Sequence, residues 1–178
     1  MTSTITSSSP TTTADLPEST PVPAARGRHA GGLLPYIGVI LFLSSTAWAA
    51  LTGTITGAGT LALAVAYLIG WAGVGAGITH IVFGSKIART IGFRTNDFQT
   101  EVGFANLAMG VTALMAGSFG PQYTLAIILI NSIFRIGAGF VHIRSMVRDR
   151  NFAINNTAIL GVNFLVPAFL ITAYALWH

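Results

Sequence analysis

Four side chains in apolar parts of this sequence could do acid–base or electrostatic chemistry: Arg135, Glu101, His80 and His142. An arginine inside a bilayer costs about 3 kcal/mol or more unless it reaches a carboxylate, backbone carbonyls, water or the interface. Glu101 is the best candidate carboxylate, because the other acidic residues beside the hydrophobic stretches should reach water. We therefore predict that Glu101 and Arg135 extend towards one another and form the charged pair of a polar pocket.

More polar side chains should share this pocket. Asn131 stands one helical turn before Arg135 and His142 two turns after it, so a polar stripe follows one helix face. The alternative is that these groups only hold helices together through interhelical hydrogen bonds. The predicted pocket faces the cytoplasm and consists of Glu101, Arg135, His80, His142, Asn131, Asn163, Asn106 and Gln99.

Several kinds of chemistry have no support in the sequence. The chain has no cysteine, which excludes disulfides, thiolate catalysis and cysteine-ligated metals. Phosphate loops, nucleophile elbows and zinc-type spacings are also missing from the sequence. We therefore assign no catalytic residue, no metal site and no cofactor. Haem ligation by His80 and His142 remains a remote alternative that no other residue supports.

The composition identifies lipid as the solvent of most of the chain. Hydrophobic residues make up 52% of the 178, charged residues 8%, and the mean hydropathy is +0.69. The stretches between Arg28 and Lys86, between Glu101 and Arg135, and after Arg150 carry no charge. They are long enough for two, one to two, and one membrane spans, since a span needs about 20 residues.

We predict an all-α, polytopic transmembrane helical bundle with five transmembrane helices. Residues 1–32 are rich in Ser, Thr and Pro and should form a disordered cytoplasmic tail, whereas residues 33–178 form the bundle. The expected spans cover about residues 33–51, 61–86, 96–117, 122–146 and 156–177.

The basic residues set the predicted orientation. With five spans, the side of the amino terminus carries all of the flanking Lys and Arg residues and the other side carries none, so the amino terminus is cytoplasmic and His178 is outside. This distribution beside the spans also argues against nucleic-acid binding, which needs a basic face on a soluble domain. Cleavage after the first apolar segment, as in a signal peptide, is the alternative and would leave four helices in the same topology. The flanking basic residues that set this orientation are Arg26, Arg28, Lys86, Arg89, Arg94, Arg144, Arg148 and Arg150.

A short motif occurs twice. Residues 75–81, Gly-Ala-Gly-Ile-Thr-His-Ile, recur as residues 137–143, Gly-Ala-Gly-Phe-Val-His-Ile. The same 62-residue offset places Glu101 opposite Asn163, which indicates that spans 2-3 and 4-5 are two parallel hairpin repeats. Alternatively, Gly and Ala simply recur where membrane helices pack closely.

Residues 80–83, 88–93 and 97–107 carry a family resemblance. They resemble an uncharacterised family of small bacterial integral membrane proteins, a domain of unknown function, with the pattern H…A-x-x-I-G-W…P-F-Q-x-E-x-G. Phe93 stands where that pattern has Trp, and Asp97 where it has Pro. The resemblance implies a compact bundle in the bacterial plasma (inner) membrane and marks His80, Gln99 and Glu101, but it implies no reaction.

Two function classes follow from these patterns. The first is an accessory or scaffold membrane protein whose partners are the lipid bilayer and either further copies of itself or a larger membrane complex. The second is a transporter or sensor of a small ion, proton or organic acid that uses Glu101 and Arg135. A membrane enzyme ranks last, because no nucleophile or metal cluster is visible.

Overall fold

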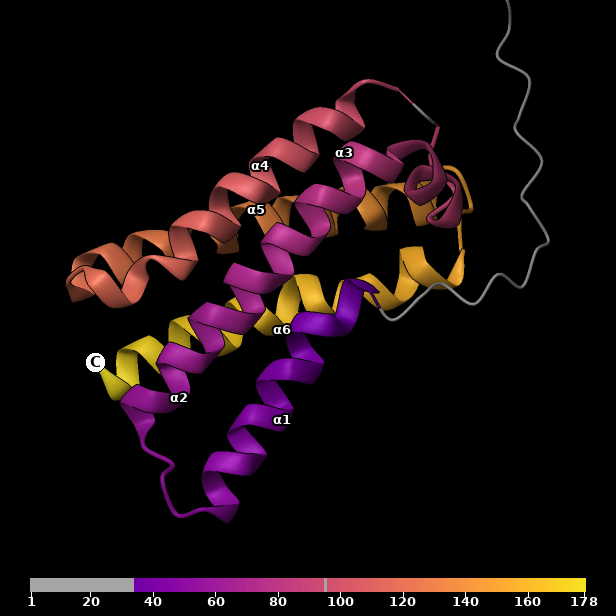
Figure 1. The fold of residues 1–178 in the computed structure, drawn as a ribbon. Helices are drawn as coiled ribbons and strands as arrows, with labels where there is room; N and C mark the ends of the chain where they lie inside the picture. The colour runs from indigo at the N-terminus through magenta and orange to yellow at the C-terminus, as the bar shows by residue number, and fades with distance from the viewer. Residues whose placement is uncertain (1–33, 95) are drawn as a thin grey trace, which may run out of the picture.

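The computed structural model describes residues 34–94 and 96–178, and all regular structure in these two ranges is helical (Figure 1). The predicted all-α class is confirmed. The predicted tail, residues 1–32, lies outside the described residues. The main helices are α1 (Ile37–Leu51), α2 (Gly57–Ala64), α3 (Ala72–Thr90), α4 (Phe98–Leu114), α5 (Pro121–Arg148) and α6 (Ile154–Trp177).

The segment Val65–Trp71 between α2 and α3 is π-helical, and with them it forms one continuous helix, Gly57–Thr90, of 34 residues. Thr56 caps this long helix, because its Oγ1 accepts a hydrogen bond from the Gly59 N–H at 3.0 Å. Near the other end the helix kinks at Phe83, which has φ −120° and ψ 24°.

In the part of the chain that the structure describes, three helices are long and apolar enough to cross a membrane: Gly57–Thr90, Pro121–Arg148 and Ile154–Trp177. They contain the predicted second, fourth and fifth spans. The helix α1 is apolar but has 15 residues, and α4 has 17. These two shorter helices correspond to the predicted first and third spans.

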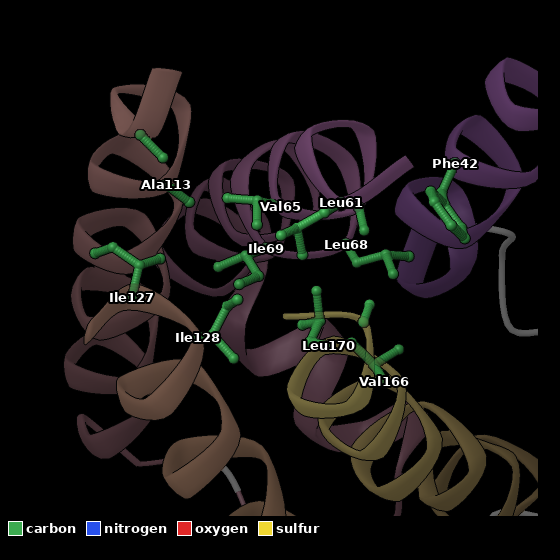
Figure 2. Packing of buried hydrophobic residues seen from close by; sticks show 13 residues of the cluster. Phe42, Leu61, Val65, Leu68, Ile69, Ala113, Ile127, Ile128, Val166 and Leu170 are labelled. Atoms are coloured by element: carbon green, nitrogen blue, oxygen red, sulfur yellow. The ribbon is translucent and has the colours of Figure 1, made fainter. Parts of the chain in front are cut away.

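Successive helices pack as antiparallel pairs, with α3 beside α4 and α5 beside α6, while α1 contacts the π-helical segment (Figure 1). The buried core draws side chains from every helix except α3 and is centred on α2 and the π-helical segment (Figure 2). Many large apolar side chains are exposed on the outside, as suits a surface that faces lipid. The labelled core residues are Phe42, Leu61, Val65, Leu68, Ile69, Ala113, Ile127, Ile128, Val166 and Leu170.

Glycines bring the backbones of α3 and α4 into contact. A Cβ atom added to Gly73 would lie 2.9 Å from the Cα of Gly110, and one added to Gly77 would lie 2.9 Å from the carbonyl oxygen of Gly103. In the other direction, a Cβ on Gly110 would lie 2.5 Å from the Val74 nitrogen. Small residues at such contacts let two membrane helices approach closely and gain van der Waals energy. This pair of helices therefore has no room for larger side chains at these positions.

Candidate functional site: polar contacts between the helices

Arg135 lies in the middle of α5 and bonds to two neutral oxygens. Its Nε donates to Oδ1 of Asn131 at 3.0 Å, and its Nη2 donates to the backbone carbonyl of Leu68 at 2.9 Å. The bond to Asn131 follows from helix geometry, because a long side chain leans towards the turn that precedes it. Leu68 belongs to the π-helical segment, a type of backbone that often occurs at functional sites. Arg135 and Asn131, which stand one turn apart in the sequence, are therefore in contact.

Glu101 does not approach Arg135. It stands in the first turn of α4 with an exposed side chain, and within residues 34–94 and 96–178 its carboxylate has no hydrogen bond or ion pair. The reason is the helical period: Glu101 precedes Gly103 by two residues, or about 200°, and Gly103 faces α3. The carboxylate therefore points away from the helix that α4 packs on, and the expected Glu101–Arg135 pair is not formed.

His80 and Gln99 meet across the first pair of helices. Nδ1 of His80, on α3, lies 3.2 Å from Oε1 of Gln99, which is buried in the first turn of α4. Both residues were predicted for the site. Their contact ties the middle of α3 to the start of α4.

His142 makes the corresponding contact across the second pair. Its Nδ1, on α5, lies 2.7 Å from Oδ1 of Asn156, which is fully buried in the first turn of α6. The Asn156 amide also donates to the backbone carbonyl of Asn151 at 2.8 Å. Sequence reasoning missed Asn156, because a polar residue at a helix start is usually a cap and carries no sign of a partner on another helix.

Asn151 joins the two helical pairs through the connections between them. Its side-chain amide donates to the Ile91 carbonyl at 2.8 Å and to Oγ of Ser145 at 3.1 Å. Gly92 has φ +73°, and a Cβ there would lie 2.5 Å from Oδ1 of Asn151. The glycine therefore satisfies two needs at once, a left-handed backbone and close approach of the asparagine.

The remaining predicted residues do not join these contacts. The Asn106 amide donates to the Val102 carbonyl of its own helix at 2.8 Å. Asn163 is 4% exposed, and its Nδ2 has no hydrogen-bond partner among the described residues. The same holds there for Oγ of Ser132, which is 3% exposed. The eight predicted residues therefore do not come together in one pocket.

Two cavities lie away from these polar residues. One, of about 460 Å³, is lined by residues from the end of α1, the α1–α2 connection, α2 and the start of the π-helical segment, including Ile55 and Thr60. The other, of about 150 Å³, lies among α1, the π-helical segment and α6 and is lined by apolar side chains such as Phe42 and Phe169. In the described part of the chain, no three His, Asp or Glu residues come close enough to hold a metal ion.

Together these features define an all-helical chain whose longest helices suit a membrane and whose polar side chains bond between helices. The model of a family described as "Family of unknown function (DUF6790)" matches residues 33–178, and the chain therefore belongs to that family. The expectation of a family of unknown function is confirmed to this extent. No curated protein and no solved structure matches the chain.

Proposed function

We propose that the chain is an integral protein of the bacterial plasma membrane that acts as an accessory or scaffold component of a larger membrane assembly. One observation carries this proposal: three polar side chains deep in the bundle bond to other helices, and none of the three lines either cavity. The contacts are those of His80, His142 and Arg135. Such bonds fix the helices relative to one another, as a scaffold requires.

Five membrane crossings fit the packing best. The first turn of α1 lies against the π-helical segment of the long helix, since a Cβ on Gly38 would lie 2.5 Å from the Tyr67 carbonyl oxygen. The helix α4 touches α3 through backbone at both Gly73 and Gly77. Because α1 and α4 share the depth of helices that span the bilayer, we assign a crossing to each.

The charged residues support a cytoplasmic amino terminus. In the described ranges, all Lys and Arg residues other than Arg135 lie in the last five residues of α3 and α5 or follow the ends of these helices. The opposite end, with the α1–α2 and α4–α5 connections, carries none in those ranges. By the positive-inside rule the basic end is cytoplasmic and His178 lies outside. Reporter fusions after His178 and at Gly120 should be active only outside, and a cytoplasmic result at either would refute this topology.

We also propose that the two helical pairs are repeats of one hairpin. The matching histidines His80 and His142 each bond to an amide in the next helix, 19 and 14 residues further on. The matching glycines Gly77 and Gly139 pack on the next helix as well. A Cβ on Gly77 would lie 2.8 Å from that of Leu107, and one on Gly139 would lie 2.7 Å from the ring of Phe164.

These two kinds of contact agree on one alignment. Leu107 and Phe164 differ by 57 residues, and so do the amide partners of the two histidines. The offset is therefore 62 in the first helix of each pair and 57 in the second, because the stretch of chain from the histidine to its amide partner is five residues shorter in the second pair. This alignment sets Asn106, and not Glu101, opposite Asn163.

Co-purification tests the scaffold role. The tagged full chain, expressed at its native level and extracted in a mild detergent, should migrate with other membrane proteins or with further copies of itself. Gly137 is a suitable position for a variant that tests association, because a Cβ there would meet nothing within 4 Å inside the chain. Gly137→Leu should weaken the association without lowering thermal stability, whereas Val82→Leu, at another exposed position, is the matched control. A chain that stays monomeric and without partners in native mass spectrometry would refute the proposal.

A second candidate function, transport or sensing of a small ion or organic acid, is favoured by Arg135. Within the described residues this cation has neutral oxygens as partners and no carboxylate. Membrane proteins keep such charges mainly where they bind ions or substrates.

A further inference from the structure

The charge of Arg135 has no compensating charge in the described part of the chain. Asp97, Glu101 and Asp149, the acidic residues of that part, are all exposed, and Asp97 and Asp149 stand beyond helix ends. Arg135 lies thirteen residues, or about 20 Å, before the end of α5. A cation placed this deep in an apolar bundle is costly when only neutral groups solvate it.

Hydrogen-bond donors outnumber acceptors around Arg135. The guanidinium has five N–H groups, of which the bonds to Asn131 and Leu68 use two. Asn131, 3% exposed, accepts through Oδ1, so its own amide protons remain to be donated. Ser132, three residues before Arg135 and therefore on the same side of α5, has a buried hydroxyl that finds no partner within residues 34–94 and 96–178.

Large apolar side chains border this region of α5. Ile128, one turn before Ser132, is fully buried, and it faces Ile69 and Leu170 in the core (Figure 2). Such surroundings lower the local dielectric constant and so strengthen the attraction between the guanidinium and an anion.

We propose that a small monovalent anion, either a halide or the carboxylate of a short organic acid, binds to Arg135. Free guanidinium N–H groups carry the charge interaction, and the Ser132 hydroxyl and Asn131 amide donate to the same anion. The Leu68 carbonyl holds the guanidinium in place from the π-helical segment. This site specifies the ligand of the second candidate function and does not depend on the scaffold role.

Thermal unfolding of the purified full chain in a neutral detergent tests the site. At constant ionic strength, replacing methanesulfonate by chloride or by acetate should raise Tm by about 2–4 °C in a saturable manner. The chloride and acetate arms distinguish a halide site from a carboxylate site. Arg135→Gln should abolish the rise, and Ser132→Ala should weaken the apparent affinity several-fold. Arg144→Gln removes an exposed cation on the same helix and should leave the rise unchanged.

A direct measurement covers the case in which Arg135→Gln does not fold. The chloride-35 NMR line of a chloride solution should broaden in the presence of the wild-type chain, and acetate should reverse the broadening by competition if both bind. The proposal is refuted if neither anion gives a saturable effect on the wild-type chain. It is equally refuted if the anion effect persists in Arg135→Gln. Partner association, measured separately by co-purification, is unaffected by either result.

Discussion

The pair α3–α4 and the pair α5–α6 share a motif but pack in different ways. In both, the glycine after Gly-Ala faces the next helix and the following histidine bonds to an amide there. In α3–α4, glycines on both helices bring backbone against backbone. In α5–α6, the ring of Phe164 fills the space at Gly139. The shared contacts set the register of each pair, while an aromatic ring stands in the second pair where backbone meets backbone in the first.

The largest contrast is expected for the two inward-facing glycines. Gly77→Val should lower the free energy of unfolding by about 3 kcal/mol or more, because the new side chain meets the backbone nitrogen of Leu107 at 2.8 Å. Gly139→Val should cost about half as much, because it meets the far end of the Phe164 ring, which can rotate. Unfolding in mixed micelles measures both, and Gly137→Val is the control. Equal losses of unfolding free energy in the two variants would contradict the packing difference between the pairs.

The histidine contacts should differ in the same assay, with a smaller effect. Asn156→Ala should cost about 2 kcal/mol, because Asn156 is fully buried and holds both His142 and the Asn151 carbonyl. Gln99→Ala should cost about 1 kcal/mol, because its bond to His80 is longer. Double-mutant cycles with each histidine isolate the coupling. A stronger coupling in the His80 pair would reverse the expected order.

The link between the pairs can be tested at Asn151. Asn151→Ala removes the bond to the Ile91 carbonyl and should cost about 1 kcal/mol. Hydrogen exchange should rise in both connections, residues 91–97 and 149–153, because the side chain holds them together. Exchange confined to residues 149–153 would mean that the two pairs are not coupled there. Asn96→Ala, at an exposed position of the first connection, is the matched control.

The smallest effects are expected at the outward-facing glycines of the motif. A Cβ on Gly75 or Gly137 would meet nothing within 4 Å. Gly75→Ala and Gly137→Ala should each stabilise the chain by about 0.5 kcal/mol through helix propensity alone. Thermal melting of the two variants should agree, and a loss of stability at one site would show that the two pairs differ on their outer faces as well.

The helices were predictable because apolar length and charge-free runs are properties of the sequence itself. The contact partners of individual side chains were less predictable from the sequence. The Gly-Ala-Gly motif predicts the repeat, but a constant offset pairs Glu101 with Asn163, since the shorter second connection leaves no mark in the motif. The partner of Arg135 is a backbone carbonyl, which any residue supplies, so the sequence offered a carboxylate instead. The exposure of the Glu101 side chain depends on how α4 is rotated about its axis. That rotation follows from Gly103 and Gly110, not from Glu101.

The π-helical segment also changes the direction in which side chains of one long helix point. Relative to an α-helix, a π-turn holds about one extra residue, which rotates all that follows by about 100°. Leu61 and Ala64 on one side of it can therefore face the core, while Gly73 and Gly77 on the other side face α4. Deleting one residue from Val65–Trp71 would restore a regular helix and turn the α3 glycines away from α4. No substitution has that effect, so this stretch should tolerate changes of residue type far better than changes of length.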